Sequence, residues 1–259
     1  MMDAALAGGF SGVGLTPRTG AGEWLAWARR PDCLEQVGRG LSRRGLRVSD
    51  IGLLTLDPEL DLEQVRALAV VAEAIGAPRL LVMCRDDDLA RAARHLRATA
   101  DVAQHYGRRI ALEPMSYSPL RDVRLACAML DDAQVPGAGI VLDLFQHERV
   151  GLGPDDVTRE VTDRLEIVQL CDGTARPRPG VSPRAEALTD RRLPGEGEFA
   201  LQRYLERLPV HVAMTVEAPS LTHTSLPVDD RARAVGRASR AVLAATPYPW
   251  PQPVAQRAE

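Results

Sequence analysis

The chain has 259 residues, of which 45% are hydrophobic and 26% are charged, and its formal net charge is −3. This length and apolar content suit one large core, either a single α/β barrel or two smaller domains. Every one of its 32 strongly basic residues is arginine, and the lack of lysine excludes lysine Schiff bases, P-loop lysines and lysine general bases.

Charge and hydropathy exclude two further classes. A net charge of −3 without a basic face predicts no binding to nucleic acid. The sequence shows neither a run of about 18 apolar residues nor a basic-then-apolar leader, so we expect no membrane span and no secretory signal. The four cysteines lie far apart without a Cys-x-x-Cys pair, which indicates buried thiols. We therefore expect a soluble cytoplasmic protein that binds neither nucleic acid nor membranes, with homo-oligomerisation left open.

Short β-branched or leucine-rich segments alternate with longer amphipathic ones. The expected strands are residues 11–15, 47–54, 79–84, 109–113, 138–143, 166–171 and 211–217. The expected helices are residues 22–45, 60–76, 87–106, 118–134, 153–164, 199–207 and 228–245. Strand followed by helix, seven times without an internal boundary, predicts a parallel sheet and favours one (β/α)8 TIM-type barrel over residues 1–245.

Individual residues mark some of the expected helix ends. Asp61 precedes one apolar-periodic run and the acidic residues 86–88 precede the next, as N-caps do. Gly107 directly follows the second of these helices, where glycine commonly ends a helix.

The two ends of the chain depart from the repeat. The opening MMDAALAGGF is typical of the end of a helix followed by a glycine turn. A complete barrel has eight strands, so the first strand either lies upstream of this chain or is missing, which would leave two sheet edges. Residues 246–259 are proline-rich, which favours polyproline II over helix, and we expect this tail to pack on the barrel.

Four successive strands place an oxygen-bearing side chain near their C-terminal ends. Glu113 ends IALE, Asp143 ends GIVLD, Gln169 lies within IVQL, and Glu217 ends VAMTVE. Taken singly, each such residue is commonly a helix cap or an arginine partner. In a barrel, however, these ends form the active-site face, and three converging carboxylates repel one another unless a cation neutralises them. The pattern predicts a divalent metal site whose hard oxygen donors favour manganese, magnesium or cobalt.

The same segments carry a resemblance to a known family. They are LEPM with Glu113, IVLDLFQHERVG with Asp143, VQLCDG with Gln169, LPGEGEF at 193–199 and VEAP with Glu217. This ordered set resembles the sugar isomerase/epimerase superfamily, with its xylose isomerase-like TIM barrel, over residues 4–245. The resemblance implies that these four residues bind one divalent ion. Many members have histidine where this chain has Gln169, and hydroxypyruvate isomerase-like members have glutamine there.

The chemistry implied by the resemblance is proton transfer beside a carbonyl. We expect a divalent-metal-dependent isomerase or epimerase of a small sugar or hydroxy-carbonyl substrate, acting through an enediolate, with Glu113 and Glu217 as the catalytic acid and base. Two alternatives are a metal-dependent dehydratase of the inosose or dehydroshikimate type and a non-catalytic binding protein on the same barrel. An abasic-site endonuclease shares the fold, but five scattered histidines and the net charge of −3 count against its histidine-rich zinc site.

Substrate-binding candidates lie near the expected metal site. The segment 173–198 contains Arg176, Arg178, Arg184, Arg191 and Arg192. We expect it to cover the metal as a lid with at least one arginine pointing inward, since guanidinium groups bind carboxylates and phosphates. From these, Arg192 is predicted to bind substrate, together with Arg149 and His147, which follow Asp143 closely. His147 reaches substrate only if the strand has already ended; otherwise it is a surface histidine.

Overall fold

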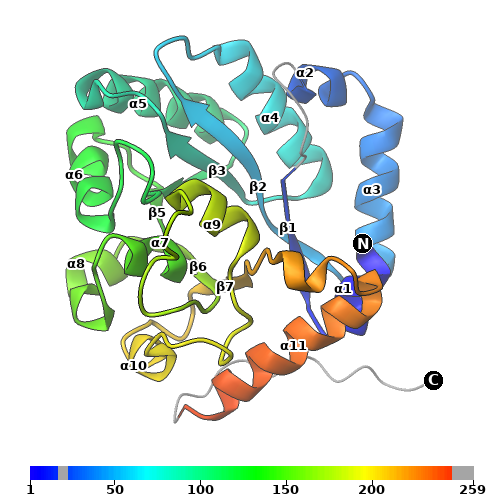
Figure 1. Cartoon of the computed structure of the whole chain (residues 1–259). Coiled ribbons are helices and arrows are strands. Elements are labelled where there is room, and N and C mark those ends of the chain that lie inside the picture. Colours follow the sequence, from blue (N-terminus) through cyan, green and yellow to red (C-terminus); the bar gives the residue numbers. More distant parts are fainter. Residues whose placement is uncertain (17–22, 247–259) are drawn as a thin grey trace.

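The computed structural model describes residues 1–16 and 23–246 and has one sheet of seven parallel strands, β1 to β7 in chain order. Figure 1 shows the sheet curving into a nearly closed barrel with helices around it. The strands are β1 Gly12–Leu15, β2 Arg47–Leu56, β3 Arg79–Cys84, β4 Arg109–Glu113, β5 Ala138–Asp143, β6 Leu165–Leu170 and β7 Ala213–Val216. The predicted TIM-type α/β barrel is confirmed.

Helices connect successive strands. They are α1 Met2–Ala7, α2 Glu23–Ala28, α3 Pro31–Arg43, α4 Leu62–Ile75, α5 Leu89–His105, α6 Val123–Ala133, α7 Leu144–Arg149, α8 Arg159–Thr162, α9 Pro183–Thr189, α10 Leu201–Leu205 and α11 Val228–Ala244, with 3-10 turns at Pro154–Asp156 and Leu221–His223. None of the helices in the described ranges has the length and apolar run that a membrane crossing needs.

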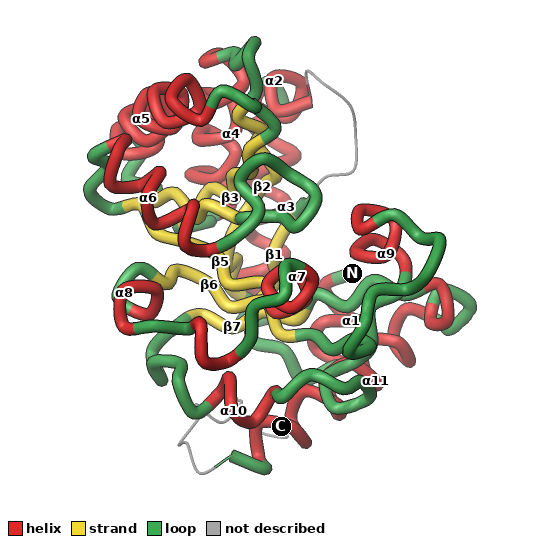
Figure 2. The backbone as a smooth tube through the Cα atoms, turned by 60° about the vertical axis from the view of Figure 1, so that its left-hand side comes forward, coloured by secondary structure: helices red, strands yellow, loops and turns green. Residues whose placement is uncertain are grey.

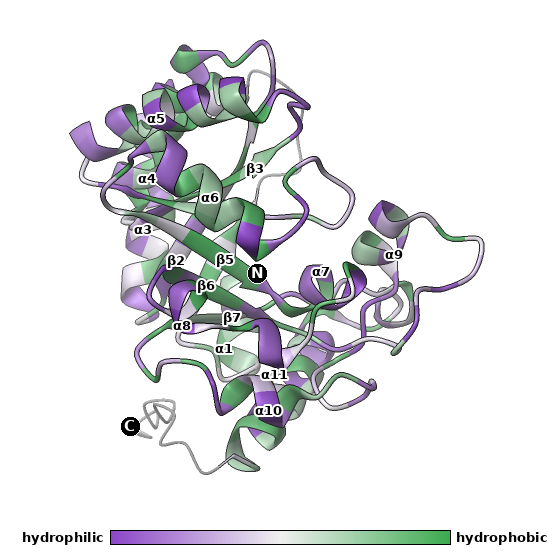
Figure 3. Ribbon diagram, turned by 90° about the vertical axis from the view of Figure 1, so that its left-hand side faces the viewer, coloured by the Kyte–Doolittle hydropathy of each residue, from purple (hydrophilic) through white to green (hydrophobic). Residues whose placement is uncertain are grey.

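The helix prediction differs from the structure at four places. The expected helix 153–164 is a 3-10 turn at Pro154–Asp156 followed by the four-residue helix α8. The expected helix 22–45 is two helices, because Pro31 lacks an amide hydrogen and starts α3 as its first residue. Two short helices, α7 and α9, were not predicted, since segments of six and seven residues carry little periodicity. Figures 2 and 3 show α7 and α9 on the same side of the barrel, and the two helices are in contact.

The predicted helix ends agree with the structure. The Asp61 side chain accepts a hydrogen bond from Glu63 N at 2.9 Å, and the Asp88 side chain accepts one from Arg91 N at 3.0 Å. Gly107 has a positive φ of 65°, the left-handed conformation that ends α5 without strain.

The barrel is open between its first and last strands. The chain begins with helix α1, as its first residues predict, and α1 packs against α11. Within the described ranges β1 pairs only with β2, and β7 pairs only with β6. Both edge strands are half-buried or exposed, whereas β3 to β6 are almost fully buried. Residues 247–259, which hold nearly all of the proline-rich tail, lie outside the described residues.

Two apolar layers hold the barrel together. Leu81, Ala111, Val141 and Ile167 form a small cluster with Leu53 inside the barrel, and each of the four comes from a different buried strand. A second and larger layer lies between strands and helices, and Figure 3 shows the strands mainly in the hydrophobic colour. This packing fixes the ends of β4 to β7, from which the polar side chains at the C-terminal face project.

Candidate active site

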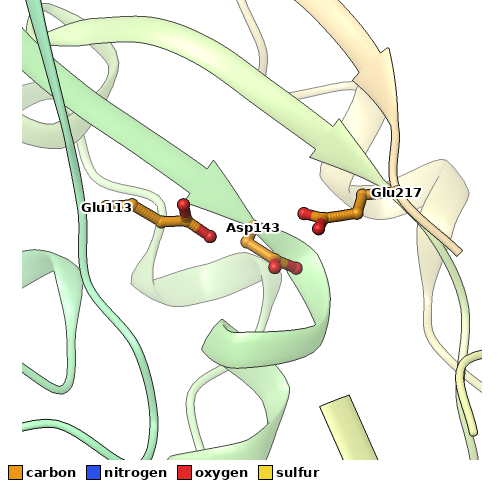
Figure 4. A group of neighbouring side chains, drawn as sticks. All are labelled: Glu113, Asp143 and Glu217. Carbon is orange, nitrogen blue, oxygen red and sulfur yellow. The ribbon is translucent and has the colours of Figure 1, made fainter. Parts of the chain in front are cut away.

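Three carboxylates meet at the C-terminal ends of the strands. Glu113 is the last residue of β4, Asp143 is the last residue of β5, and Glu217 directly follows β7. One carboxylate oxygen from each residue lies within 4.8 Å of those from the other two. Figure 4 shows the three side chains pointing toward one another. The structure therefore brings three of the four predicted ligands together at the predicted face.

The fourth predicted ligand, Gln169, lies beside this cluster. It belongs to β6 and is paired in register with Asp143 of β5. Its side chain is buried, and its Oε1 has no hydrogen-bond partner among residues 1–16 and 23–246. A buried amide oxygen without a partner costs about 1–3 kcal/mol, so Gln169 is an acceptor that protein packing alone does not explain.

Burial and mutual repulsion set the charge state of the cluster. The pKa of Glu113 is raised well above its ordinary value, first by burial and then by the negative charges of Glu217 and Asp143. Glu113 and Asp143 are 3% and 2% exposed, whereas the Glu217 side chain is 44% exposed. Glu217 is therefore the carboxylate of the three that a solute can reach most easily.

Arg191 is the cation that the protein itself supplies to the cluster. Its Nη1 donates to Asp143 Oδ1 at 3.0 Å and lies 2.8 Å from Oδ2, although Oδ2 accepts no hydrogen bond. Its Nη2 lies 4.0 Å from Glu217 Oε2, and its Nε donates to Ala187 O at 2.8 Å. One guanidinium thus faces three carboxylates, which leaves the cluster with an excess of negative charge when all three are ionised.

The donor set fits a divalent cation. Ligand oxygens lie about 2.0–2.6 Å from such an ion, so two oxygens on one ion are at most about 5 Å apart. The 4.8 Å spread of the three carboxylates meets this limit. The unpaired Gln169 Oε1 adds a fourth oxygen, and a cation would relieve the repulsion that raises the pKa of Glu113. All four donors are hard oxygens, and neither histidine nor thiolate takes part.

The inward arginine is Arg191, and the predicted substrate arginine Arg192 is exposed. Arg192 N donates to Asp172 O at 2.9 Å, and Asp172 N donates to Arg192 O at 3.1 Å, an isolated antiparallel bridge. Side chains alternate in such an extended segment, so one arginine of the pair enters the barrel and the other faces solvent. The sequence contains the pair but not the register of this bridge, which is why Arg191 was missed as a site residue.

Arg149 has partners within the protein, and its expected role in substrate binding stays a prediction. Its guanidinium donates to both carboxylate oxygens of Glu186 at 2.9 Å and to Thr174 O at 3.0 Å. Both members of this ion pair are buried, and Arg149 also lies over the Phe145 ring, 4.3 Å from its centroid. The pair fastens the segment after β6 to α7, so its role in the structure is to hold that segment in place.

His147 lies on α7, because β5 ends at Asp143, whose side chain caps the helix by accepting from Phe145 N at 2.8 Å. His147 is only 3% exposed, its Nε2 lies 3.1 Å from Gly153 O, and its ring meets Tyr204 edge-on. Burial lowers its pKa, which favours the neutral imidazole. The surface alternative is therefore wrong, and substrate contact by His147 stays a prediction.

The glycine-rich segment 193–199 wraps around Asp172. The buried Asp172 carboxylate accepts hydrogen bonds from Gly195 N at 3.0 Å and from Phe199 N at 3.0 Å. Gly195 has a positive φ of 84°, and a Cβ at Gly197 would lie 2.2 Å from Asp172 Oδ1. These glycines are turn residues, and they hold the segment that leads from Arg191 back to the barrel.

Fold and site together define a TIM-type barrel protein with its candidate active site at the C-terminal face. The chain belongs to the family described as xylose isomerase-like TIM barrel, whose model matches residues 2–238. A comparison with curated proteins gave no match.

Solved structures with the same fold have low sequence identity to this chain. The IolI protein with a binding zinc atom has a TM-score of 0.79 at 14% identity, covering 94% of this chain and 91% of that one. The probable 3-DHS dehydratase AsbF from Bacillus anthracis has a TM-score of 0.73 at 14% identity, covering 92% of each chain. The 3-keto-D-glucoside 4-epimerase YcjR from E. coli has a TM-score of 0.70 at 14% identity, covering 94% and 92%.

Proposed function

We propose that this protein is a divalent-metal-dependent isomerase or epimerase of a small sugar or hydroxy-carbonyl compound. The observation that carries the proposal is the cluster of Glu113, Asp143 and Glu217, whose oxygens lie within 4.8 Å of one another at the C-terminal face. The family and an epimerase of the same fold support the reaction class.

The proposed ligands are the three carboxylates and Gln169. When bound, a divalent ion would supply positive charge that polarises a substrate carbonyl and stabilises the negative charge that develops on its oxygen. Arg191 holds Asp143 in place through its hydrogen bond of 3.0 Å and its contact with the Phe145 ring. Because all four donors are oxygens, manganese, magnesium or cobalt is our first choice, and zinc, which the IolI structure contains, is the comparison.

Glu217 is the proposed base that removes a proton from the carbon beside the carbonyl. Its side chain is 44% exposed, so a substrate above the cluster can reach it. Glu113 lies across the cluster and is buried, and it is the second carboxyl group that we propose for the proton transfer. Two carboxyl groups on opposite sides of the same carbon suit an exchange of proton position or of configuration.

A dehydratase is the second candidate, because a probable 3-DHS dehydratase has the same fold. Dehydration begins with the same removal of a proton beside a carbonyl and differs in the next step, where a neighbouring hydroxyl leaves. The product therefore decides between the two enzyme classes.

One experiment tests the proposal and its alternatives. Metal-stripped protein is incubated in deuterated water with ketoses, inososes, hydroxypyruvate and dehydroshikimate, with and without manganese, magnesium, cobalt or zinc, and products are followed by NMR. We expect metal-dependent exchange into one compound together with an isomer or epimer of it. A dehydrated product would favour the second candidate. Binding without exchange in any metal would favour a non-catalytic binding protein and contradict the enzyme proposal.

A further inference from the structure

The loop that follows β4 has a fixed shape beside the acidic cluster. Ser118 N donates to Met115 O at 2.8 Å, which closes a β-turn whose two central residues are Ser116 and Tyr117. Met115 N donates to Leu120 O at 3.0 Å, and Ser118 Oγ donates to the same oxygen at 2.8 Å. The loop therefore presents Tyr117 from a turn that is hydrogen-bonded on both sides.

Gln146 fastens this turn to α7. Its Oε1 accepts one hydrogen bond from Ser116 N at 3.0 Å and a second from Ser116 Oγ at 2.7 Å, and its side chain is 2% exposed. Two donors on one amide oxygen fix the orientation of the side chain. Because α7 begins directly after Asp143, this contact ties the turn to the acidic cluster.

The phenol of Tyr117 belongs to this turn, four residues after Glu113 and next to Ser116, which Gln146 ties to the start of α7. Four charged groups of the site act on it, namely Glu113, Arg191, Asp143 and Glu217. Burial raises the pKa of Tyr117, and the charge of Glu113 adds to the rise, so the hydroxyl is a protonated donor at neutral pH. The side chain is half-buried, and no group in the described parts of the chain hydrogen-bonds its hydroxyl.

We propose that Tyr117 is a substrate-contacting residue whose hydroxyl donates a hydrogen bond to a substrate oxygen, and that Ser116 and Gln146 are positioning residues that hold it there. The ionised carboxylates can only accept hydrogen bonds, so a substrate oxygen that needs a donor must find it elsewhere. A neutral phenol supplies that donor without adding positive charge that would compete with a cation. The substrate class is then a compound with a further hydroxyl or carbonyl oxygen beside its reacting carbonyl.

This inference rests on the proposed function and is tested with the compound that the parent protein turns over in the exchange experiment. Tyr117→Phe removes only the hydroxyl, and we expect kcat/KM to fall about 10-fold, the loss of one hydrogen bond. The matched control is Tyr106→Phe, a half-buried tyrosine at the end of α5 that precedes β4 and so lies at the opposite end of the barrel. For the control we expect a change below about twofold.

Two measurements can overturn the role of Tyr117. Equal effects of Tyr117→Phe and Tyr106→Phe on kcat/KM would show that the hydroxyl does not contact substrate. A comparable loss of manganese affinity in Tyr117→Phe, measured by calorimetry, would show that it acts through the carboxylates. If the unsubstituted protein binds a panel compound without turning it over, its dissociation constant for that compound is compared with that of Tyr117→Phe. We then expect the substitution to raise the dissociation constant about 10-fold.

The positioning role of Gln146 is tested by a double-mutant cycle. Gln146→Leu removes the acceptor that holds the turn, and we expect it to lower kcat/KM about 10-fold in the parent but by less than about twofold in the Tyr117→Phe background. The positioning role is overturned if Gln146→Leu lowers kcat/KM equally in the parent and in Tyr117→Phe. It is also overturned if a lowered unfolding temperature of Gln146→Leu accounts for the loss of kcat/KM in both proteins. A parent that neither turns over nor binds any panel compound overturns the proposed function and this inference together. An active parent with Tyr117→Phe unchanged overturns this inference alone.

Discussion

The two ends of the barrel interior both contain buried acidic side chains, but they neutralise them differently. At the N-terminal end, Glu166 is 7% exposed, and its two oxygens accept hydrogen bonds at 2.8 Å from Arg79 Nε and Arg109 Nε. At the C-terminal end, three carboxylates within 4.8 Å of one another share Arg191. At the first end two arginines bind Glu166, and the buried Asp50 is a second carboxylate near Arg79; at the other end one arginine serves three carboxylates.

This difference separates a structural ion pair from a site that is built to receive a cation. A buried carboxylate with two arginines is satisfied, so its removal is expected to affect stability alone. Where carboxylates outnumber their cations they repel one another, which here adds to the raised pKa of Glu113. Carboxyl groups with strongly perturbed pKa values are typical of functional sites. Substitutions of acid by amide at the two ends should therefore have opposite consequences.

The largest expected effect is the loss of turnover in Glu217→Gln. The amide keeps an oxygen that can serve as a ligand but cannot accept the proton, so we expect kcat to fall at least about 100-fold. Manganese affinity, measured by calorimetry on the same preparation, should remain measurable. Unchanged turnover would move the role of base to Glu113 or His147.

Metal binding should stabilise the protein only through the C-terminal end. Manganese at about 100 times its dissociation constant should raise the free energy of unfolding by about 2.7 kcal/mol. The same rise is expected in Glu166→Gln, whose ligands are intact, and its absence is expected in Asp143→Asn combined with Glu113→Gln. Denaturant titrations with and without manganese measure it. An equal rise in all three proteins would mean that the metal binds elsewhere.

At the N-terminal end, Glu166→Gln should destabilise the protein without changing its chemistry. The substitution leaves two arginines without their anion, and the Arg79 side chain is only 22% exposed, so we expect a loss of about 1–3 kcal/mol in the free energy of unfolding. The Arg109 side chain is 53% exposed, and solvent will screen part of the cost. A loss of kcat larger than about twofold in this variant would break the distinction between the two ends.

At the C-terminal end, the same type of substitution should stabilise the metal-free protein. The folded pKa of Glu113 is raised, so its contribution to stability is present at low pH and is lost as the pH rises through that pKa. Glu113→Gln removes this loss, and we expect the metal-free variant to exceed the parent at pH 8 by on the order of 1 kcal/mol. The two should converge near pH 4. Lower stability of the variant at pH 8 would show that the charges do not repel in the folded protein.

The sequence predicted those features of the two barrel ends that depend on the periodicity of the strands and on the residues at their ends. Glu113, Asp143 and Glu217 were found because a barrel places the last residues of parallel strands on one face. The choice between Arg191 and Arg192 depends on the register of a long-range bridge to Asp172, which no local pattern contains. The role of Arg149 depends on Glu186, 37 positions away in a helix too short to be predicted.

The smallest expected effect concerns His147. Unlike the acidic groups at the two ends of the barrel, His147 is buried without a carboxylate within hydrogen-bond reach among the described residues. Burial lowers its pKa against the weaker opposing effects of the Gly153 carbonyl, Asp156 and Asp122, so the unfolded chain takes up a proton more readily than the folded one. Stability should therefore fall as the pH drops from about 6.5, and His147→Phe should reduce that fall by on the order of 1 kcal/mol between pH 7 and pH 5. Denaturant titrations at three pH values measure the slope, with His105→Phe, an exposed histidine on α5, as the control that keeps it. If His147→Phe and His105→Phe give the same slope, burial of His147 does not govern the acid sensitivity of the fold.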